Sequence, residues 1–295
     1  MTRRLRIATR GSELARTQAD RVAALLGGDC DLVIVSTVGD RRTDAPIWEM
    51  GGQGVFVKEV QEAVLDGRAD LAVHSAKDLP STTPEGLVIG AFPERADPRD
   101  CLVGSTLADL PTGAVVATGS VRRRAQLAGL RPDLSFAPLR GNIQTRLDKA
   151  AGFDAAVFAV AALDRLGLSD RASEILEPEV MLPQVGQGAL AVECRVEDAE
   201  TFERLAAVDS VDVRMAVTAE RAFLDEMGSG CNLPVGAFGR LDGEEVVVEA
   251  LLASLDGRIV LRHSVRGTDP QAAGRAVAAG LMDDRGGRVL LEESA

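Results

Sequence analysis

Short apolar runs alternate with segments of helical spacing from residue 5 to residue 160, and this alternation constrains the fold more than any other property of the chain. The strands expected from it are Leu5–Thr9, Asp31–Ser36, Leu71–His74, Leu87–Phe92, Ala114–Ala117, Leu134–Pro138 and Asp154–Val160. The helices expected between them are Ser12–Leu26, Val55–Leu65, Ser120–Ala128 and Ile143–Ala150. Alternation of this kind, with turn residues between the segments, predicts largely parallel sheets in an α/β protein.

The carboxyl-terminal part follows another pattern. A helix is expected at Val211–Met227 and a closing helix at Pro270–Met282, with strands at Glu245–Leu255 and Arg258–Arg266 between them. The two strands are joined by Asp256-Gly257, which is a strong hairpin signal. This order predicts a small α+β domain.

Two charged or proline- and glycine-containing stretches mark the expected crossings between domains. They are Pro93–Asp100 and Leu182–Gly188. We therefore expect three domains, consisting of residues 1–93 with 189–208, residues 97–186, and residues 211–295.

The charge of the chain excludes some classes of partner. Its 295 residues carry a formal net charge of −12, which argues against nucleic acid and against an anionic membrane surface. None of the four cysteines forms a CxxC pair and there are only two histidines, so no structural metal site is expected. The first residues lack the apolar core of a signal peptide, and we expect a cytoplasmic protein with reduced thiols.

One local arrangement occurs three times. An apolar run ends, a small or polar residue follows, and a helix is expected to begin with arginine nearby, in ATRGSEL from Ala8, ATGSVRRR from Ala117 and PLRGNIQTR from Pro138. Open α/β sheets bind ligands at the carboxyl ends of their strands, and helix N-termini and arginine both favour anions. A single instance is more simply explained by a solvated arginine and an ordinary N-cap, but three instances favour binding sites for carboxylates or phosphates.

Two further segments contain reactive side chains. Lys77 and Asp78 follow directly on an apolar strand, where a carboxylate and an ammonium group could serve acid–base chemistry or could simply be solvated. Cys231 lies in the glycine-rich loop GSGCNLPVG, where it could be an inert thiol, a nucleophile or the attachment point of a covalent group. The stretch VGQGALA matches a dinucleotide fingerprint formally, but a strand rather than a helix is expected after it, so we reject that reading.

Seven segments in order closely resemble the porphobilinogen deaminase family and cover residues 5 to 240. They are RIATRGSELARTQA, GGQGVFVKEVQEAVLDGRADLAVHSAKDLP, RRRAQL, LRGNIQTRL, AVAALDRLGL, LPQVGQGALAVECR and ERAFLDEMGSGCNLPVGAF. The resemblance implies three domains, of which the first two are similar to periplasmic binding proteins around a cleft. It also implies a transferase that joins four porphobilinogens into the linear tetrapyrrole hydroxymethylbilane and releases ammonia.

The resemblance also implies roles for individual residues. Cys231 corresponds to the cysteine that holds a dipyrromethane cofactor through a thioether, and Asp78, with Lys77 beside it, corresponds to the catalytic carboxylate. The residues implied to hold the cofactor are Lys58, Lys77, Asp78, Ser120, Arg122, Arg123, Arg140 and Arg146. Those implied to hold substrate carboxylates are Arg10, Arg140, Arg146 and Arg165. We expect a monomer with porphobilinogen as its small-molecule partner.

The chain departs from the family pattern at two positions. Gln53 stands where a lysine is frequent, and Gly119 stands where a serine is common before the arginine pair, so a charge and a hydroxyl are absent there. Two other classes of protein remain as alternatives. A two-lobed receptor for anionic solutes would have no need of the Cys231 loop, and a transferase with a cysteine nucleophile would carry no covalent pyrrole.

Overall fold

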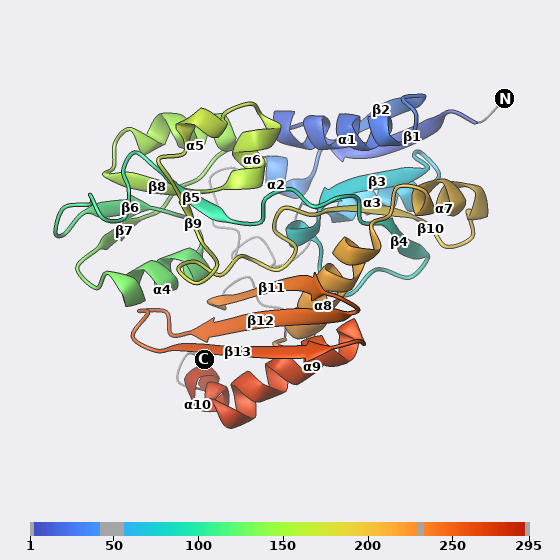
Figure 1. Cartoon of the computed structure of the whole chain (residues 1–295). Helices are drawn as coiled ribbons and strands as arrows, with labels where there is room; N and C mark the ends of the chain where they lie inside the picture. The colour runs from blue at the N-terminus through green and yellow to red at the C-terminus, as the bar shows by residue number, and fades with distance from the viewer. Residues whose placement is uncertain (1–2, 42–55, 229–232, 293–295) are drawn as a thin grey trace. The chain divides into compact units, whose positions relative to one another are not determined.

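The computed structural model describes residues 3–41, 56–228 and 233–292, which divide into two compact units (Figure 1). Unit 1 consists of Met1–Ala96, Ala189–Arg214 and Ser229–Cys231, and unit 2 of Asp97–Gly188, Met215–Gly228 and Asn232–Ala295. Within the described residues the chain therefore passes between units at residues 96/97, 188/189 and 214/215.

Unit 1 contains a five-stranded sheet in the order β2-β1-β3-β10-β4. The strands are β1 (Leu5–Arg10), β2 (Cys30–Val35), β3 (Leu71–Ser75), β4 (Leu87–Ala91) and β10 (Leu190–Arg195). β1 runs parallel to β2 and β3, whereas β10 is antiparallel to β3 and β4. Four of the five strands therefore run in one direction, as the predicted largely parallel arrangement requires, and only β10, which returns from a distant part of the chain, runs the other way.

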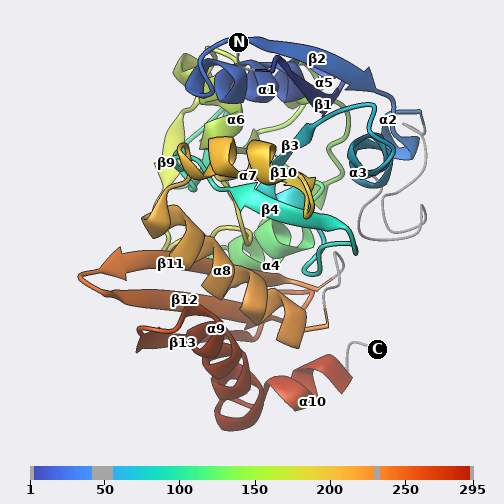
Figure 2. The same ribbon diagram turned by 90° about the vertical axis from the view of Figure 1, so that its right-hand side faces the viewer.

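Helices cover both faces of this sheet. On one face, α1 (Glu13–Leu25) and α7 (Ala199–Ala206) contribute Ala19, Val22 and Leu205 to a core with Ile7 and Val73. Figure 2 shows α7 beside β4 and β10. On the other face, α3 (Lys58–Leu65) packs its apolar residues against the alternate side chains of β1 and β3. The short α2 (Val38–Arg41) follows β2. Side chains that alternate along one strand therefore face different helices.

Unit 2 begins with a second five-stranded sheet, in the order β7-β6-β8-β5-β9. The strands are β5 (Asp100–Val103), β6 (Val115–Ala117), β7 (Ser135–Ala137), β8 (Ala155–Ala159) and β9 (Glu174–Leu176). β7, β6 and β8 are parallel, and β5 is antiparallel to β8 and β9. Every residue of β8 is buried, as its continuous apolar run predicts. The helices are α4 (Val121–Leu130), α5 (Ile143–Ala150) and α6 (Val160–Arg165).

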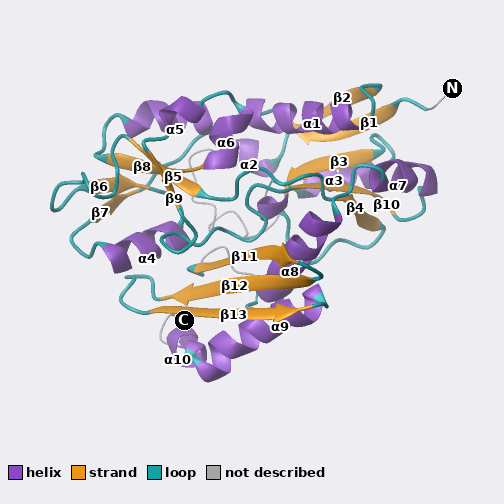
Figure 3. Ribbon diagram, viewed as in Figure 1, coloured by secondary structure: helices purple, strands orange, loops and turns teal. Residues whose placement is uncertain are grey.

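A third, antiparallel sheet has the order β11-β12-β13 (Figure 3). Its strands are β11 (Val235–Asp242), β12 (Glu245–Ala253) and β13 (Val260–Gly267), and the helices α8 (Val211–Glu226), α9 (Pro270–Ala279) and α10 (Gly287–Glu292) accompany it. Val277 of α9 and Phe223 of α8 belong to the same core as the inner residues of β12. β11 was not expected from the sequence. The hairpin forms as predicted, with Gly257 at φ +72°. β12 ends at Ala253 and β13 begins at Val260, each two residues short of the expected bound, so the connection is longer.

The α/β class and the small α+β part are confirmed, whereas β5, β9, α6 and α7 were not anticipated. These four elements are short, between 3 and 8 residues. Within the described residues, none of the helices combines the length and the apolarity needed to span a bilayer.

Candidate functional site

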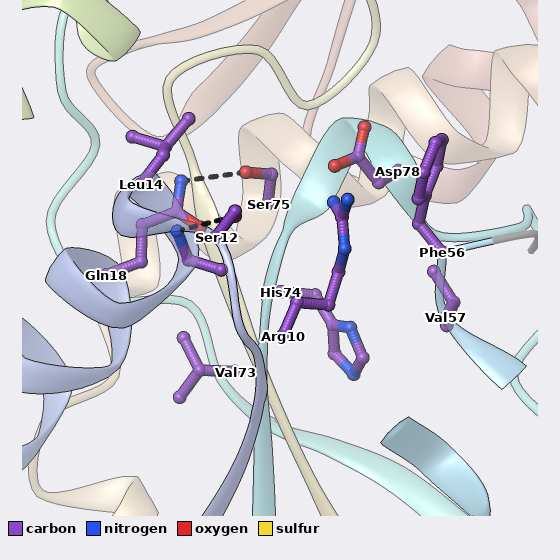
Figure 4. A pocket seen from close by; sticks show the side chains of 11 residues that line it. Arg10, Ser12, Leu14, Gln18, Phe56, Val57, Val73, His74, Ser75 and Asp78 are labelled. Carbon is purple, nitrogen blue, oxygen red and sulfur yellow. Dashed lines mark hydrogen bonds between the residues drawn. The ribbon is translucent and has the colours of Figure 1, made fainter. Parts of the chain in front are cut away.

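A small cavity in unit 1 lies where β1 and β3 end (Figure 4). β1 delivers Arg10 to it, and Ser12 then begins α1 by accepting a hydrogen bond from the backbone N–H of Ala15. β3 ends at Ser75, and the single turn η2 (Ala76–Asp78) carries Asp78 to the same cavity. Because β1 and β3 are parallel neighbours, their carboxyl ends meet at one edge of the sheet.

The cavity combines a cation and an anion with an aromatic ring. Arg10 and Asp78, which are 68 positions apart in the sequence, both line it. The guanidinium of Arg10 lies over the ring of Phe56, 4.2 Å from its centroid, which orients the cation. Phe56 was not singled out in the sequence, although it is one of only eight phenylalanines.

The two predicted lysines of unit 1 do not line this cavity. Lys77 is half-buried in η2 next to Asp78, and Lys58 is exposed at the first position of α3. Their expected contacts with a bound cofactor stay predictions.

Unit 2 places two helix N-termini at the carboxyl ends of adjacent parallel strands. After β6, Ser120 caps α4 by accepting from the N–H of Arg123, and after β7, Asn142 caps α5 by accepting from the N–H of Thr145. Gly119 allows the two loops to approach, since a Cβ there would lie 2.9 Å from the carbonyl oxygen of Leu139. A serine at this position would lack space for its side chain in this backbone arrangement, so the absent hydroxyl and the close approach of the two loops are linked.

Three predicted arginines remain half-buried around these strand ends, namely Arg140, Arg146 and Arg165. Arg140 lies in the loop after β7, and its carbonyl accepts a hydrogen bond from Lys149. Arg146 extends from α5 to within 5.6 Å of the ring centre of Phe158 on β8, and Arg165 at the end of α6 donates to the carbonyl of Gly188. The guanidinium of Arg146 thus lies near an aromatic ring, and that of Arg165 donates to a backbone carbonyl.

Arg122 and Arg123 differ from these three arginines in burial and in partner, and their expected contacts with a bound cofactor stay predictions. Both are buried, with exposed fractions of 3% and 7%, and both pair with the fully buried Asp100. Arg122 also donates to the carbonyl of Leu182, and Arg123 to that of Val157. Their carboxylate partner in this structure is therefore part of the protein itself.

Asp100 is the residue that sequence reasoning missed, because it appeared to belong to a charged linker. Burial opposes its ionisation, but the charges of Arg122 and Arg123 outweigh that effect and hold the pKa of Asp100 well below its usual range. Gln187 donates a further hydrogen bond of 2.8 Å to the same carboxylate. No spacing rule connects Asp100 to these partners in the sequence.

Cys231 and Gln53 lie outside the described residues. The other three cysteines are free thiols. Burial raises the pKa of the Cys101 thiol to about 12 and that of Cys194 to about 11, and it also raises the pKa of Cys30, so all three are poor nucleophiles. Among the described residues, no cluster of three or more histidine, cysteine or acidic side chains could hold a metal ion.

Comparison with known proteins gives matches along nearly the whole chain. Residues 5–203 match the family model described as "Porphobilinogen deaminase, dipyromethane cofactor binding domain", and residues 214–283 match that of the C-terminal domain. The porphobilinogen deaminase of Roseiflexus sp. (strain RS-1) is 48% identical, with 99% of each chain covered. That of Syntrophus aciditrophicus (strain SB) is 44% identical over 98% of each chain.

Among solved structures, the chain is similar to the lipoprotein Tp32 from Treponema pallidum. The TM-score is 0.42 and the identity 15%, with 70% of this chain and 91% of that chain covered.

Proposed function

The chain belongs to the porphobilinogen deaminase family, and from this premise we propose which of its residues act in catalysis and which bind substrate and cofactor. The reaction joins four porphobilinogen molecules into hydroxymethylbilane and releases ammonia at each condensation. The observation that carries the proposal is the pairing of Arg10 and Asp78 in one cavity at the carboxyl edge of a sheet.

Asp78 is proposed as the catalytic carboxylate. Departure of the amino group leaves positive charge on the pyrrole nitrogen of the substrate, and a carboxylate near that N–H stabilises the cation more than the neutral ring. Asp78 is exposed at the end of η2, so a substrate can reach it. Arg10, stacked on Phe56, is proposed to bind a carboxylate of the incoming substrate.

The residues of unit 2 fit a polyanionic cofactor. A dipyrromethane carries several carboxylates, and when bound it supplies the pyrrole end to which the first substrate is joined. Ser120 caps a helix whose N-terminus favours anions, and Arg140, Arg146 and Arg165 keep partial access to solvent. These four residues would hold the carboxylates, while Cys231 would provide the thioether.

Arg122 and Arg123 have a different place in this proposal. Their guanidinium groups already neutralise Asp100, so we assign them to positioning α4 and its capped N-terminus rather than to direct contact. Lys58 and Lys77 are retained as secondary contacts to cofactor carboxylates. The active species is proposed to be a single chain without a resident metal, in the cytoplasm; light scattering tests the first point and activity after treatment with a chelator tests the second.

The test is incubation of the purified protein with porphobilinogen, with ammonia and hydroxymethylbilane measured together. The proposal expects about four ammonia molecules for each product, as four condensations require. Binding of porphobilinogen without ammonia release would instead support the anionic-solute receptor. Turnover by a protein that carries no covalent pyrrole would support the cysteine-nucleophile transferase.

A further inference from the structure

Four buried polar side chains of unit 1 surround the end of β3 and have no part in the function proposed above. They are Gln18, Gln61, His74 and Glu193, with exposed fractions of 4%, 5%, 5% and 0%. Burying a polar side chain costs free energy unless hydrogen bonds within the protein replace those it made to water. Four such side chains close together therefore indicate a structural or functional role.

Two of them hold the end of β3 from the face covered by α3. Glu193 pairs with Ala72 across the β3–β10 ladder, and His74 lies two residues further along β3, so both side chains point to this face. Nε2 of His74 is 3.1 Å from Oε2 of Glu193. Gln61 of α3 donates to both carboxylate oxygens of Glu193, at 3.1 and 2.9 Å.

The side chains of His74 and Glu193 are in close polar contact, but the geometry is not that of a well-aligned hydrogen bond. The distance satisfies an ion pair, yet Nε2 of His74 makes no hydrogen bond in the described structure. Glu193 is fully buried, so its carboxylate needs polar partners, and Gln61 and His74 provide them. This contact links His74 to β10 and holds its side chain at the cavity that it lines.

Ser75, the residue after His74 on β3, is held from the face of the sheet that α1 covers. The hydroxyl of Ser75 accepts a hydrogen bond of 2.8 Å from Nε2 of Gln18 on α1 (Figure 4). Two consecutive side chains of β3 are thus anchored on opposite faces of the sheet, and η2 with Asp78 begins at the following residue. The N–H of Ala76 also donates to the carbonyl of Ala189.

We infer that His74–Glu193 and Ser75–Gln18 form a strand-end clamp that positions Asp78. His74, Glu193 and Ser75 are then positioning residues for the reaction, and the inference rests on the proposed role of Asp78. A displacement of about 1 Å in a catalytic group can lower a rate about 10²-fold, so a loosened clamp lowers the rate while the substrate still binds.

The experiment combines Glu193→Gln with Asp78→Asn. Glu193→Gln preserves the shape of the side chain and removes its charge. We expect it to lower kcat about 10- to 100-fold with KM unchanged, and to cause no further loss in the Asp78→Asn background. Equal fold losses in the two backgrounds, or a change in KM alone, would overturn the inference.

Two further variants guard against a simple folding defect. Ser75→Ala removes one hydrogen bond from the other face and should show the same dependence on Asp78 with a smaller loss. Glu220→Gln is the matched control, because Glu220 is an equally buried carboxylate that accepts from the N–H groups of Gly186 and Gly239 in unit 2. Its effect should be equal in both backgrounds, and a dependence on Asp78 there would contradict a specific clamp.

Hydrogen exchange separates this inference from the proposed function. The N–H of Ala76 bonds to Ala189 and that of Leu79 to Ala76, so both report on the turn that carries Asp78. Glu193→Gln should speed exchange at these two amides relative to the rest of unit 1, whether or not the protein proves to be a deaminase. Unchanged exchange at both amides would overturn the clamp, whereas an inactive wild-type protein would overturn only the proposed function.

Discussion

The cavity of unit 1 and the arginine pair of unit 2 use their charges in opposite ways. Arg10 and Asp78 line a cavity, and Arg10 rests on an aromatic ring. Arg122 and Arg123 are buried and share Asp100 as their counter-charge. All four follow or flank a strand end, so position in the sequence does not distinguish them. What distinguishes the two regions is that the guanidinium groups of Arg122 and Arg123 are buried against a buried carboxylate, whereas Arg10 and Asp78 line a cavity.

The largest expected effect tests the buried pair. Asp100→Asn leaves Arg122 and Arg123 buried without their carboxylate, and breaking a buried ion pair on one side costs about 3–5 kcal/mol. Denaturant unfolding of the variant should show this loss. Asp133→Asn is the control, because it removes a carboxylate from a pair with Arg131 that lies at the surface, and it should change stability much less. Equal losses in the two variants would contradict the structural role of Asp100.

The second prediction tests the chemical side of the comparison. Asp78→Asn should fold and carry the cofactor but lose about 10²-fold or more in kcat, because the charge that stabilises the cationic pyrrole is gone. Asp78→Glu should retain part of the activity, since the charge survives in a displaced position. Single-turnover release of ammonia from loaded enzyme is the measurement. Release at the wild-type rate in Asp78→Asn would place the catalytic role elsewhere.

A third prediction compares two arginines of unit 2 directly. Arg140→Leu should keep wild-type stability and weaken binding of cofactor or growing chain about 10- to 150-fold, since one charge-assisted hydrogen bond contributes about 1.5–3 kcal/mol. Arg122→Leu should instead lower stability, because it breaks the pair with Asp100. Stability curves and binding assays on both variants check this. A reversed pattern would remove the distinction between the half-buried and the buried arginines.

The fourth prediction concerns how the stability contributed by Asp100 changes at acidic pH. The pKa of Asp100 in the folded protein lies below the ordinary value of 3.8, so its contribution to stability is complete above that pH and is lost as the pH falls toward the folded pKa. The stability gap between wild type and Asp100→Asn should therefore narrow below about pH 4, by up to about 1.4 kcal/mol per pH unit for one proton. Denaturation curves over a pH series measure it. A gap that stays constant with pH would show that the pKa of Asp100 is the same in the folded and unfolded states, and would contradict its lowering by the arginines.

The smallest effects are expected at the two helix caps. Ser12→Ala in unit 1 and Ser120→Ala in unit 2 each remove one N-cap hydrogen bond and should each cost about 1 kcal/mol. Only Ser120→Ala should also lower the fraction of protein to which the cofactor becomes attached, because the start of α4 is proposed to bind its carboxylates. Thermal unfolding and the fraction of loaded protein measure the two effects. Loss of cofactor from Ser12→Ala as well would contradict the separate roles of the two units.

Local patterns in the sequence predicted much of the fold. The continuous apolar run of β8, the caps of α1 and α4 and the Asp256-Gly257 hairpin could all be recognised because each depends on neighbouring residues. β5 and β9 could not, because they are strands of 4 and 3 residues that form by pairing with distant segments. The antiparallel course of β10 has the same cause.

In the candidate site, too, features set by neighbouring residues could be predicted, and features set by pairing between distant segments could not. Arg10 and Asp78 could each be placed at the carboxyl end of a predicted strand, but only the pairing of β1 with β3 brings them to one cavity. Asp100 could not be assigned to Arg122 and Arg123, since burial and pairing across 22 residues are set by the packed sheet. Glu193 was hidden for the same reason, because its relation to His74 depends on the register of β10 against β3.

The central claim is that this chain is a deaminase whose cofactor is attached at Cys231, and peptide mapping by mass spectrometry of the purified protein tests it most directly. The account predicts that the peptide containing Cys231 is heavier by one dipyrromethane, and that Cys231→Ser removes both the added mass and the activity. An adduct on Cys30, Cys101 or Cys194, or full activity of Cys231→Ser, would contradict it.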